Sequence, residues 1–115
     1  MNVAGGGGSG QKPVFKIKNS ASLRTNETEL PFEIDSSEVT NFSYMFSECN
    51  NLKTIPQLDT SNGTNFSAMF QSCFKLITIP QLDVSNGFNL NYMTQSCNAL
   101  ENITFIGSIN LKIDF

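Results

Sequence analysis

A 24-residue unit repeats three times without gaps between residues 35 and 106. The units 35–58 and 59–82 agree at 15 of 24 positions, and the units 59–82 and 83–106 agree at 11 of 24. One such unit cannot bury its own apolar side chains, so chains with this periodicity stack their units to form a continuous core. The repeat therefore predicts three similar stacked units within one domain, for which 115 residues suffice.

Each unit has the same predicted local structure. The second unit begins with Asp59-Thr-Ser-Asn-Gly63, whose residue types favour a turn. Apolar residues then follow at the i, i+3, i+4 and i+7 spacing of one helix face, at Phe66, Met69, Phe70 and Cys73. The closing segment 76–82 contains Pro80, which suits a short extended strand better than a helix. The predicted unit is therefore a turn, a short helix and a short strand.

The segments outside the repeat predict an arm and two caps. Residues 1–12 form a Gly-rich arm or linker, and GGGGSG also resembles an engineered linker. Residues 13–34 contain two short apolar segments, PVFKIKN and LPFEI, and are expected to form an N-terminal β cap. Residues 107–115 alternate apolar and polar side chains, which predicts a C-terminal strand cap. The solenoid proper is expected to span residues 35–106.

The segment DTSNGTNFSAMFQSC, residues 59–73, resembles the BspA-like leucine-rich repeats of bacterial surface proteins. Similar units also occur in phage structural proteins, and the resemblance covers about residues 35–106. It implies an α/β solenoid, a short right-handed leucine-rich-repeat-like coil of three repeats with one short helix and one short strand each, closed by β caps. It also implies a surface, adhesive or structural role, and it brings no catalytic residues.

The residue inventory argues against enzymatic and metal chemistry. Histidine is absent, and the three cysteines are spaced by 24 residues, so no CxxC chelate exists. We expect these thiols to be buried, although a metal or redox site is the alternative. No catalytic residue, cofactor or metal is predicted.

Two sets of repeated polar residues can be interpreted either as internal hydrogen-bonding groups or as a binding site. The repeated aspartates (Asp35, Asp59 and Asp83) are expected to cap turns, with a calcium edge as the alternative. The repeated asparagines (Asn41, Asn65 and Asn89) are expected to bond to the backbone rather than to a ligand.

The variable positions are the candidate binding residues, because in a stack they form rows on the surface. One predicted exposed row comprises Tyr44, Ala68 and Tyr92, and a second comprises Lys53, Ile77 and Glu101. Tyrosine is favoured at recognition surfaces, whereas ordinary variation at solvent-facing positions is the alternative. Partner docking is assigned to the arm and the first cap, at Gly5, Gly6, Gly7, Gly8, Val14, Phe15 and Ile17.

Charge and hydropathy restrict the partners. The net charge is −3, and the repeats contain six acidic residues and two lysines, which argues against a nucleic-acid groove. No apolar run reaches 18 residues, so no membrane insertion is expected. Residues 1–10 show neither the basic region nor the apolar stretch of a signal peptide, so we expect a chain without an export signal or an anchor.

These features predict a non-enzymatic virion protein (a head-fibre, decoration or tail-associated protein). It would contact other virion proteins or itself, or a bacterial surface ligand. The alternative is a ligand-binding fragment of an adhesin on the bacterial cell surface.

Overall fold

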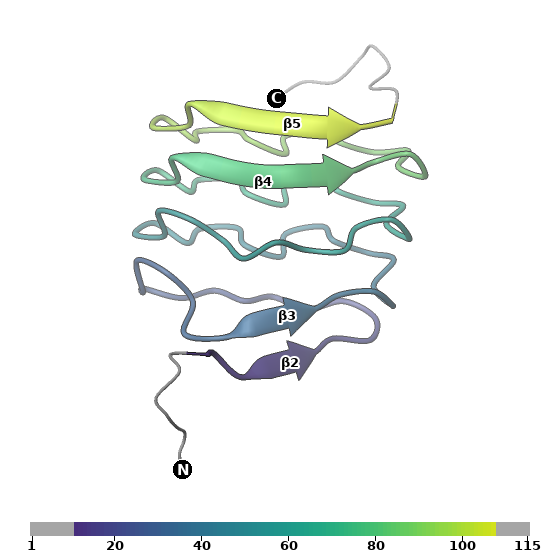
Figure 1. Ribbon diagram of the computed structural model, residues 1–115. Coiled ribbons are helices and arrows are strands. Elements are labelled where there is room, and N and C mark those ends of the chain that lie inside the picture. Colours follow the sequence, from purple (N-terminus) through teal and green to yellow (C-terminus); the bar gives the residue numbers. More distant parts are fainter. Residues whose placement is uncertain (1–10, 108–115) are drawn as a thin grey trace.

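The computed structural model describes residues 11–107. Each 24-residue unit forms one layer, and the layers lie one above another on an N-terminal segment, residues 11–34 (Figure 1). Residues 35–58 form layer 1, residues 59–82 form layer 2 and residues 83–106 form layer 3. Backbone hydrogen bonds join residues that are 23 to 24 positions apart, for example Phe42 N to Asn65 O at 2.8 Å and Phe66 N to Asn89 O at 2.8 Å. The period of the sequence is therefore the period of the stack.

Four short strands occur in the described residues, in two parallel two-stranded sheets. Strand β2 (Val14–Lys16) pairs with β3 (Glu33–Asp35) in the register Phe15 to Ile34. Strand β4 (Thr78–Asp83) pairs with β5 (Asn102–Ile106), with a register shift between Ile79 and Leu82. Both sheets lie along the same side of the stack in Figure 1.

The predicted α/β solenoid, with a helix and a strand in each repeat, is wrong. The described residues contain no helix, and their four short strands form only the two small parallel sheets. Where the apolar spacing predicted helices, the chain forms runs of turns at residues 43–48, 67–72 and 91–96. Phe66, Met69, Phe70 and Cys73 are buried as expected, but on a backbone of a different kind.

The hydrogen-bond pattern explains why no helix forms. In layer 2, alternate amides donate to layer 3 at 2.8–2.9 Å, from Phe66, Ala68, Phe70 and Ser72. The intervening amides bond three residues back within their own layer, from Met69, Gln71 and Cys73. A helix would instead bond each interior amide four residues back and keep every φ negative. We call these aligned runs of turns the turn ladder.

Two residues in each run have a left-handed backbone, at the same two repeat positions. Their φ angles lie between 54° and 64°, at Tyr44, Glu48, Ala68, Ser72, Tyr92 and Ser96. None of them is glycine, so each costs about 1–2 kcal/mol of backbone strain. The inter-layer hydrogen bonds and the buried core offset this cost.

The first repeat lacks the expected strand, which is a second difference from the predicted unit. Pro56 and Pro80 are aligned between layers 1 and 2, and neither has an amide N–H for a sheet ladder. Layer 3 has Thr104 at the same position, which retains its amide, and there β4 and β5 pair. Strand pairing therefore appears where the repeat loses its proline.

The core is a column of in-register apolar side chains. Phe42 stacks on Phe66 with ring centroids 5.3 Å apart, and Phe46 stacks on Phe70 at 5.6 Å. All four rings are fully buried. Gly63 leaves room for the first stack, because an added Cβ would lie 2.4 Å from the Phe66 ring.

The predicted end segments fall largely outside the description. The Gly-rich arm lies there except for Gln11 and Lys12, and so does the C-terminal cap except for Gly107. Within the predicted N-terminal cap, β2 falls in the PVFKIKN segment and β3 overlaps the LPFEI segment.

Candidate functional site

The first candidate row lies on the face that the turn ladder forms. Tyr44 and Tyr92 are 56% and 47% exposed, but Ala68 between them is only 1% exposed. The expected exposure of Ala68 is therefore wrong, because its single methyl group is flanked by a layer on either side. Adjacent hydrogen-bonded layers lie about 5 Å apart, so the two tyrosines project about 10 Å from each other across a small residue. The row is thus a pair of aromatic side chains with a gap between them.

The second candidate row lies at the edge where each run of turns passes towards the strand side. Ile77 N donates to Lys53 O at 3.0 Å, and Glu101 N donates to Ile77 O at 2.8 Å. All three side chains are exposed, and Ile77 is 41% exposed. The structure therefore aligns these residues through their backbones and leaves their side chains to solvent.

Two exposed aromatic residues were missed by the sequence reasoning. Phe74 is 44% exposed and Phe88 is 74% exposed. Each is apolar at a position that is polar in both other repeats: Phe74 aligns with Asn50 and Asn98, and Phe88 with Thr40 and Thr64. A comparison of the copies for such replacements would have found both.

The proposed docking residues of the first cap differ in how exposed they are. Val14 and Phe15 are 65% and 54% exposed, and the Phe15 ring meets Phe32 edge-on at 5.0 Å. Ile17 is instead half-buried and packs against the core. Gly5, Gly6, Gly7 and Gly8 lie outside the described residues.

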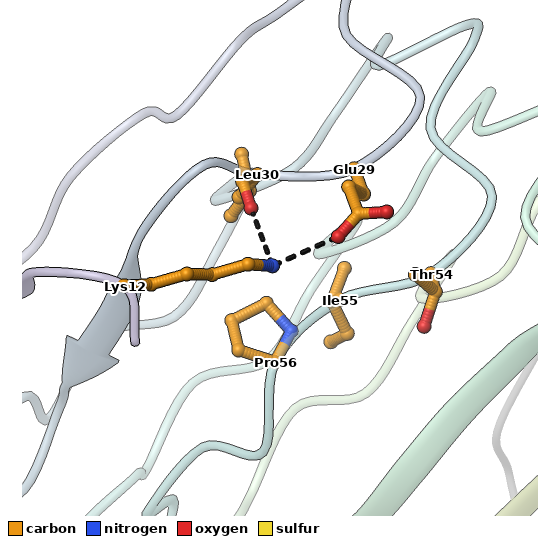
Figure 2. Close-up of a pocket in the computed structure, with 6 residues that line it drawn as sticks. All are labelled: Lys12, Glu29, Leu30, Thr54, Ile55 and Pro56. Atoms are coloured by element: carbon orange, nitrogen blue, oxygen red, sulfur yellow. Dashed lines mark hydrogen bonds and ion pairs between the residues drawn. The ribbon is translucent and has the colours of Figure 1, made fainter. Parts of the chain in front are cut away.

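A pocket of about 220 Å³ lies between the N-terminal segment and layer 1. Figure 2 shows the six residues that line it: Lys12, Glu29, Leu30, Thr54, Ile55 and Pro56. The Lys12 ammonium donates to Glu29 Oε2 and to Leu30 O, both at 2.9 Å. The hydrogen bond from Lys12 lowers the pKa of Glu29. The two charges that line this pocket therefore satisfy each other, which disfavours it as a site for a charged ligand.

The aspartate ladder caps turns, as predicted. Asp83 Oδ1 accepts hydrogen bonds from Ser85 N at 2.9 Å and Ser85 Oγ at 2.6 Å, and Asp35 and Asp59 make the same contacts two residues on. The hydrogen bond from the Ser85 hydroxyl lowers the pKa of Asp83 most, and the bond from the Ser85 amide lowers it further. The hydroxyl and the amide of Ser37 lower the pKa of Asp35 in the same way. These local hydrogen bonds favour the ionised form of Asp35 and Asp83.

The asparagine ladder likewise bonds internally, as predicted. The Oδ1 atoms of Asn41, Asn65 and Asn89 each accept the amide two residues on, at 2.9–3.0 Å. A further pair that sequence reasoning did not single out links the layers: Asn62 Nδ2 donates to Ser37 O and Asn86 Nδ2 donates to Ser61 O, both at 2.8 Å. The repeated polar side chains are thus part of the framework.

The cysteine ladder is also part of the framework. Cys73 Sγ donates to Phe46 O at 3.0 Å, and Cys97 Sγ donates to Phe70 O at 3.1 Å, so each thiol bonds to the layer below. Burial raises the pKa of Cys97 to about 11. The hydrogen bond with Cys49 raises the pKa of Cys73, and burial raises it further. The thiols of Cys73 and Cys97 are therefore poor nucleophiles and poor ligands. The same hydrogen bond with Cys73 lowers the pKa of Cys49 to about 7.

Neither a metal cluster nor a spanning helix emerges from the described part of the chain. Residues 11–107 contain no group of three or more His, Cys, Asp or Glu placed to hold a metal ion. They also contain no helix that could cross a bilayer. The surface features that we retain as a candidate site are the two rows and the exposed aromatic residues Phe74 and Phe88.

The family model described as "Mycoplasma protein of unknown function, DUF285" matches residues 15–108. The chain belongs to this family. The DUF285 match contains all three layers and most of the N-terminal segment beneath them. No curated protein and no solved structure matches the chain.

Proposed function

We propose that the chain is a non-enzymatic structural and binding module whose layers present a side-chain surface to protein partners. The observation that carries the proposal is that the repeated polar positions form internal hydrogen bonds, whereas a variable position presents exposed aromatic side chains. The repeated aspartates, asparagines and cysteines are engaged in bonds within the framework. The exposed tyrosines Tyr44 and Tyr92 stand at a variable position. Such aromatic side chains offer a large contact area with little rotamer entropy to lose.

The place that we propose for this module is a virion, as a head-fibre, decoration or tail-associated protein. Support comes from the resemblance of residues 59–73 to BspA-like units, which also occur in phage structural proteins. The test is extraction of purified particles followed by mass spectrometry. Stoichiometric recovery of the chain supports the virion role, and its absence from the particle contradicts it.

A ligand-binding part of a bacterial surface adhesin is the second candidate. The description of the DUF285 family names a bacterial genus, which favours a bacterial chain over a phage one. Brief protease treatment of intact cells distinguishes the two candidates. Release of peptides from residues 35–106 by intact cells supports the adhesin, whereas their release only after lysis argues against it.

The binding surface itself is tested by photo-crosslinking. A benzophenone amino acid replaces Tyr44 or Tyr92 in the particle or on the cell, and the matched control carries it at Thr54, which is exposed on the strand side. We expect a defined protein adduct from the tyrosine positions and none from Thr54. Equal labelling from all three positions would remove the basis for assigning the surface to this row.

A further inference from the structure

The upper edge of the turn ladder presents hydrogen-bond donors only. In layers 1 and 2 the amides at alternate positions donate upward to the next layer. The equivalent amides of layer 3 belong to Leu90, Tyr92, Thr94 and Ser96, and none of them donates to an acceptor among the described residues. Alternate carbonyl oxygens of layer 3 accept from layer 2 (Asn89, Asn91, Met93 and Gln95), and the intervening ones accept from amides within layer 3 (Leu90, Tyr92 and Thr94). Within residues 11–107 these donors have no acceptor, so a partner that binds the upper edge has to bring acceptors.

This polarity restricts how two copies can meet. Two upper edges facing each other would oppose donors with donors, so a two-fold head-to-head contact through the turn ladder cannot form hydrogen bonds. The strands restrict the contact in the same way, because β2 pairs with β3 and β4 pairs with β5 in parallel. A partner that continues the stack must therefore approach with its lower end.

The lower end of the stack offers complementary groups. Glu33 N donates to Pro13 O and Ile17 N donates to Asp35 O, so the Pro13 carbonyl and the Ile17 amide face β3. Because successive residues of a strand alternate, the amide and carbonyl groups of Val14 and Lys16 point to the outer edge of β2. No strand within residues 11–107 pairs with this outer edge, and such an edge is a template for another chain.

Acceptors also lie beneath the turns of layer 1. Leu23 N donates to Met45 O at 2.7 Å, which places the segment around Leu23 below that face. The carbonyl oxygens of Ala21, Ser22 and Arg24 accept no hydrogen bond from the described residues. In a continued stack these acceptors would lie opposite the donor row of layer 3.

We propose that the occupant of the upper edge is a second copy of this chain, stacked head to tail through its N-terminal segment. Charge supports this partner: residues 83–107 contain Asp83 and Glu101 and no basic residue, whereas residues 11–34 contain four basic residues against three acidic ones. The two ends lie at opposite poles of the stack in Figure 1. A heterologous contact of this kind does not close, so it generates linear oligomers. The inference goes beyond the proposed binding role and does not depend on the tyrosine row.

The test uses two full-length variants that each block one end. Val14→Pro removes the outward amide of β2 and leaves its bonds to β3 intact, and Val14→Thr is the matched control that keeps the amide. Thr94→Pro removes one donor from the upper edge, with Thr94→Val as its control. Sedimentation velocity over a concentration series measures association, and circular dichroism verifies that each variant folds.

We expect wild type and both controls to form oligomers that grow with concentration, and each proline variant to associate about tenfold more weakly or not at all. A mixture of the two variants retains one intact upper and one intact lower end, so it should form one-to-one dimers. A wild type that stays monomeric to millimolar concentration overturns the proposal, as does a stable homodimer of either proline variant.

Amide exchange provides an independent measurement should Thr94→Pro not fold. In the wild type, protection of the Tyr92, Thr94 and Ser96 amides should rise together with that of Val14 and Lys16 as concentration increases. Association without added protection at these amides would contradict the head-to-tail contact.

Discussion

Substitution of Ser96 tests the backbone of the turn ladder, because the turns and the helix expected from sequence predict opposite results. Ser96 is exposed, and its φ of 64° is left-handed. Ser96→Gly removes about 1–2 kcal/mol of left-handed strain. Glycine also loses more backbone entropy on folding, which offsets roughly 0.5–1 kcal/mol of this stabilisation. We therefore expect the free energy of unfolding to rise by about 0.5–1 kcal/mol.

Valine at the same position should have the opposite effect. A β-branched residue in the left-handed region is a steric outlier, so Ser96→Val should lower the free energy of unfolding by about 1 kcal/mol or more. In a helix the order would reverse, because glycine would cost about 0.5 kcal/mol relative to serine and valine would be nearly neutral. The rank order of three proteins therefore decides between the two backbones.

Urea unfolding followed by circular dichroism measures these differences. Asn91→Gly is the matched control, because Asn91 is exposed in the same run of turns and does not have a positive φ. There glycine should cost about 0.5–1 kcal/mol. If Ser96→Gly is destabilising and Ser96→Val is neutral, the reasoning from left-handed turns is refuted.

Three further predictions concern the core, a contact between two layers and a turn within layer 3. Gly63→Ala places a Cβ 2.4 Å from the Phe66 ring and 2.9 Å from the Phe42 ring, and should lower the unfolding free energy by about 1–3 kcal/mol in urea. Thr60→Val removes the buried hydroxyl that donates to Asp83 O and accepts from Asp83 N, which should cost about 1–3 kcal/mol; an unchanged denaturation midpoint would contradict this. The pKa of Asp83 is lowered in the fold, so its contribution is present above the ordinary aspartate range and is lost as pH falls through the folded value. Asp83→Asn keeps the acceptor without the titration, so its stability should fall less steeply than that of wild type between about pH 5 and pH 2; identical acid profiles would count against it.

The burial pattern was predictable from the sequence because it depends on spacing. Phe66, Met69, Phe70 and Cys73 face the core, and the Asp59 carboxylate accepts its hydrogen bonds where turn chemistry placed them. The backbone between these residues was not predictable in the same way. A helix and a run of turns both bring residues i, i+3, i+4 and i+7 to one side, so the spacing cannot separate them.

The left-handed positions explain why the helix prediction was wrong. A left-handed turn is usually recognised by glycine or asparagine, but here the chain has Tyr44, Ala68 and Ser72. Local propensity gave no signal, because the conformation is imposed by amides that bond to the next layer. Ala68 shows the same limit for the candidate site, since its burial depends on the layers around it and not on its own residue type.

Amide hydrogen exchange in dilute solution tests the layered turn ladder most directly. We predict slow exchange at Ala68, Phe70 and Ser72, whose amides donate to layer 3 at 2.8–2.9 Å. The equivalent amides of Tyr92 and Thr94 should exchange quickly, because they have no acceptor in the described part of the chain. A continuous block of protected amides through residues 91–97, as a helix would give, would contradict the account.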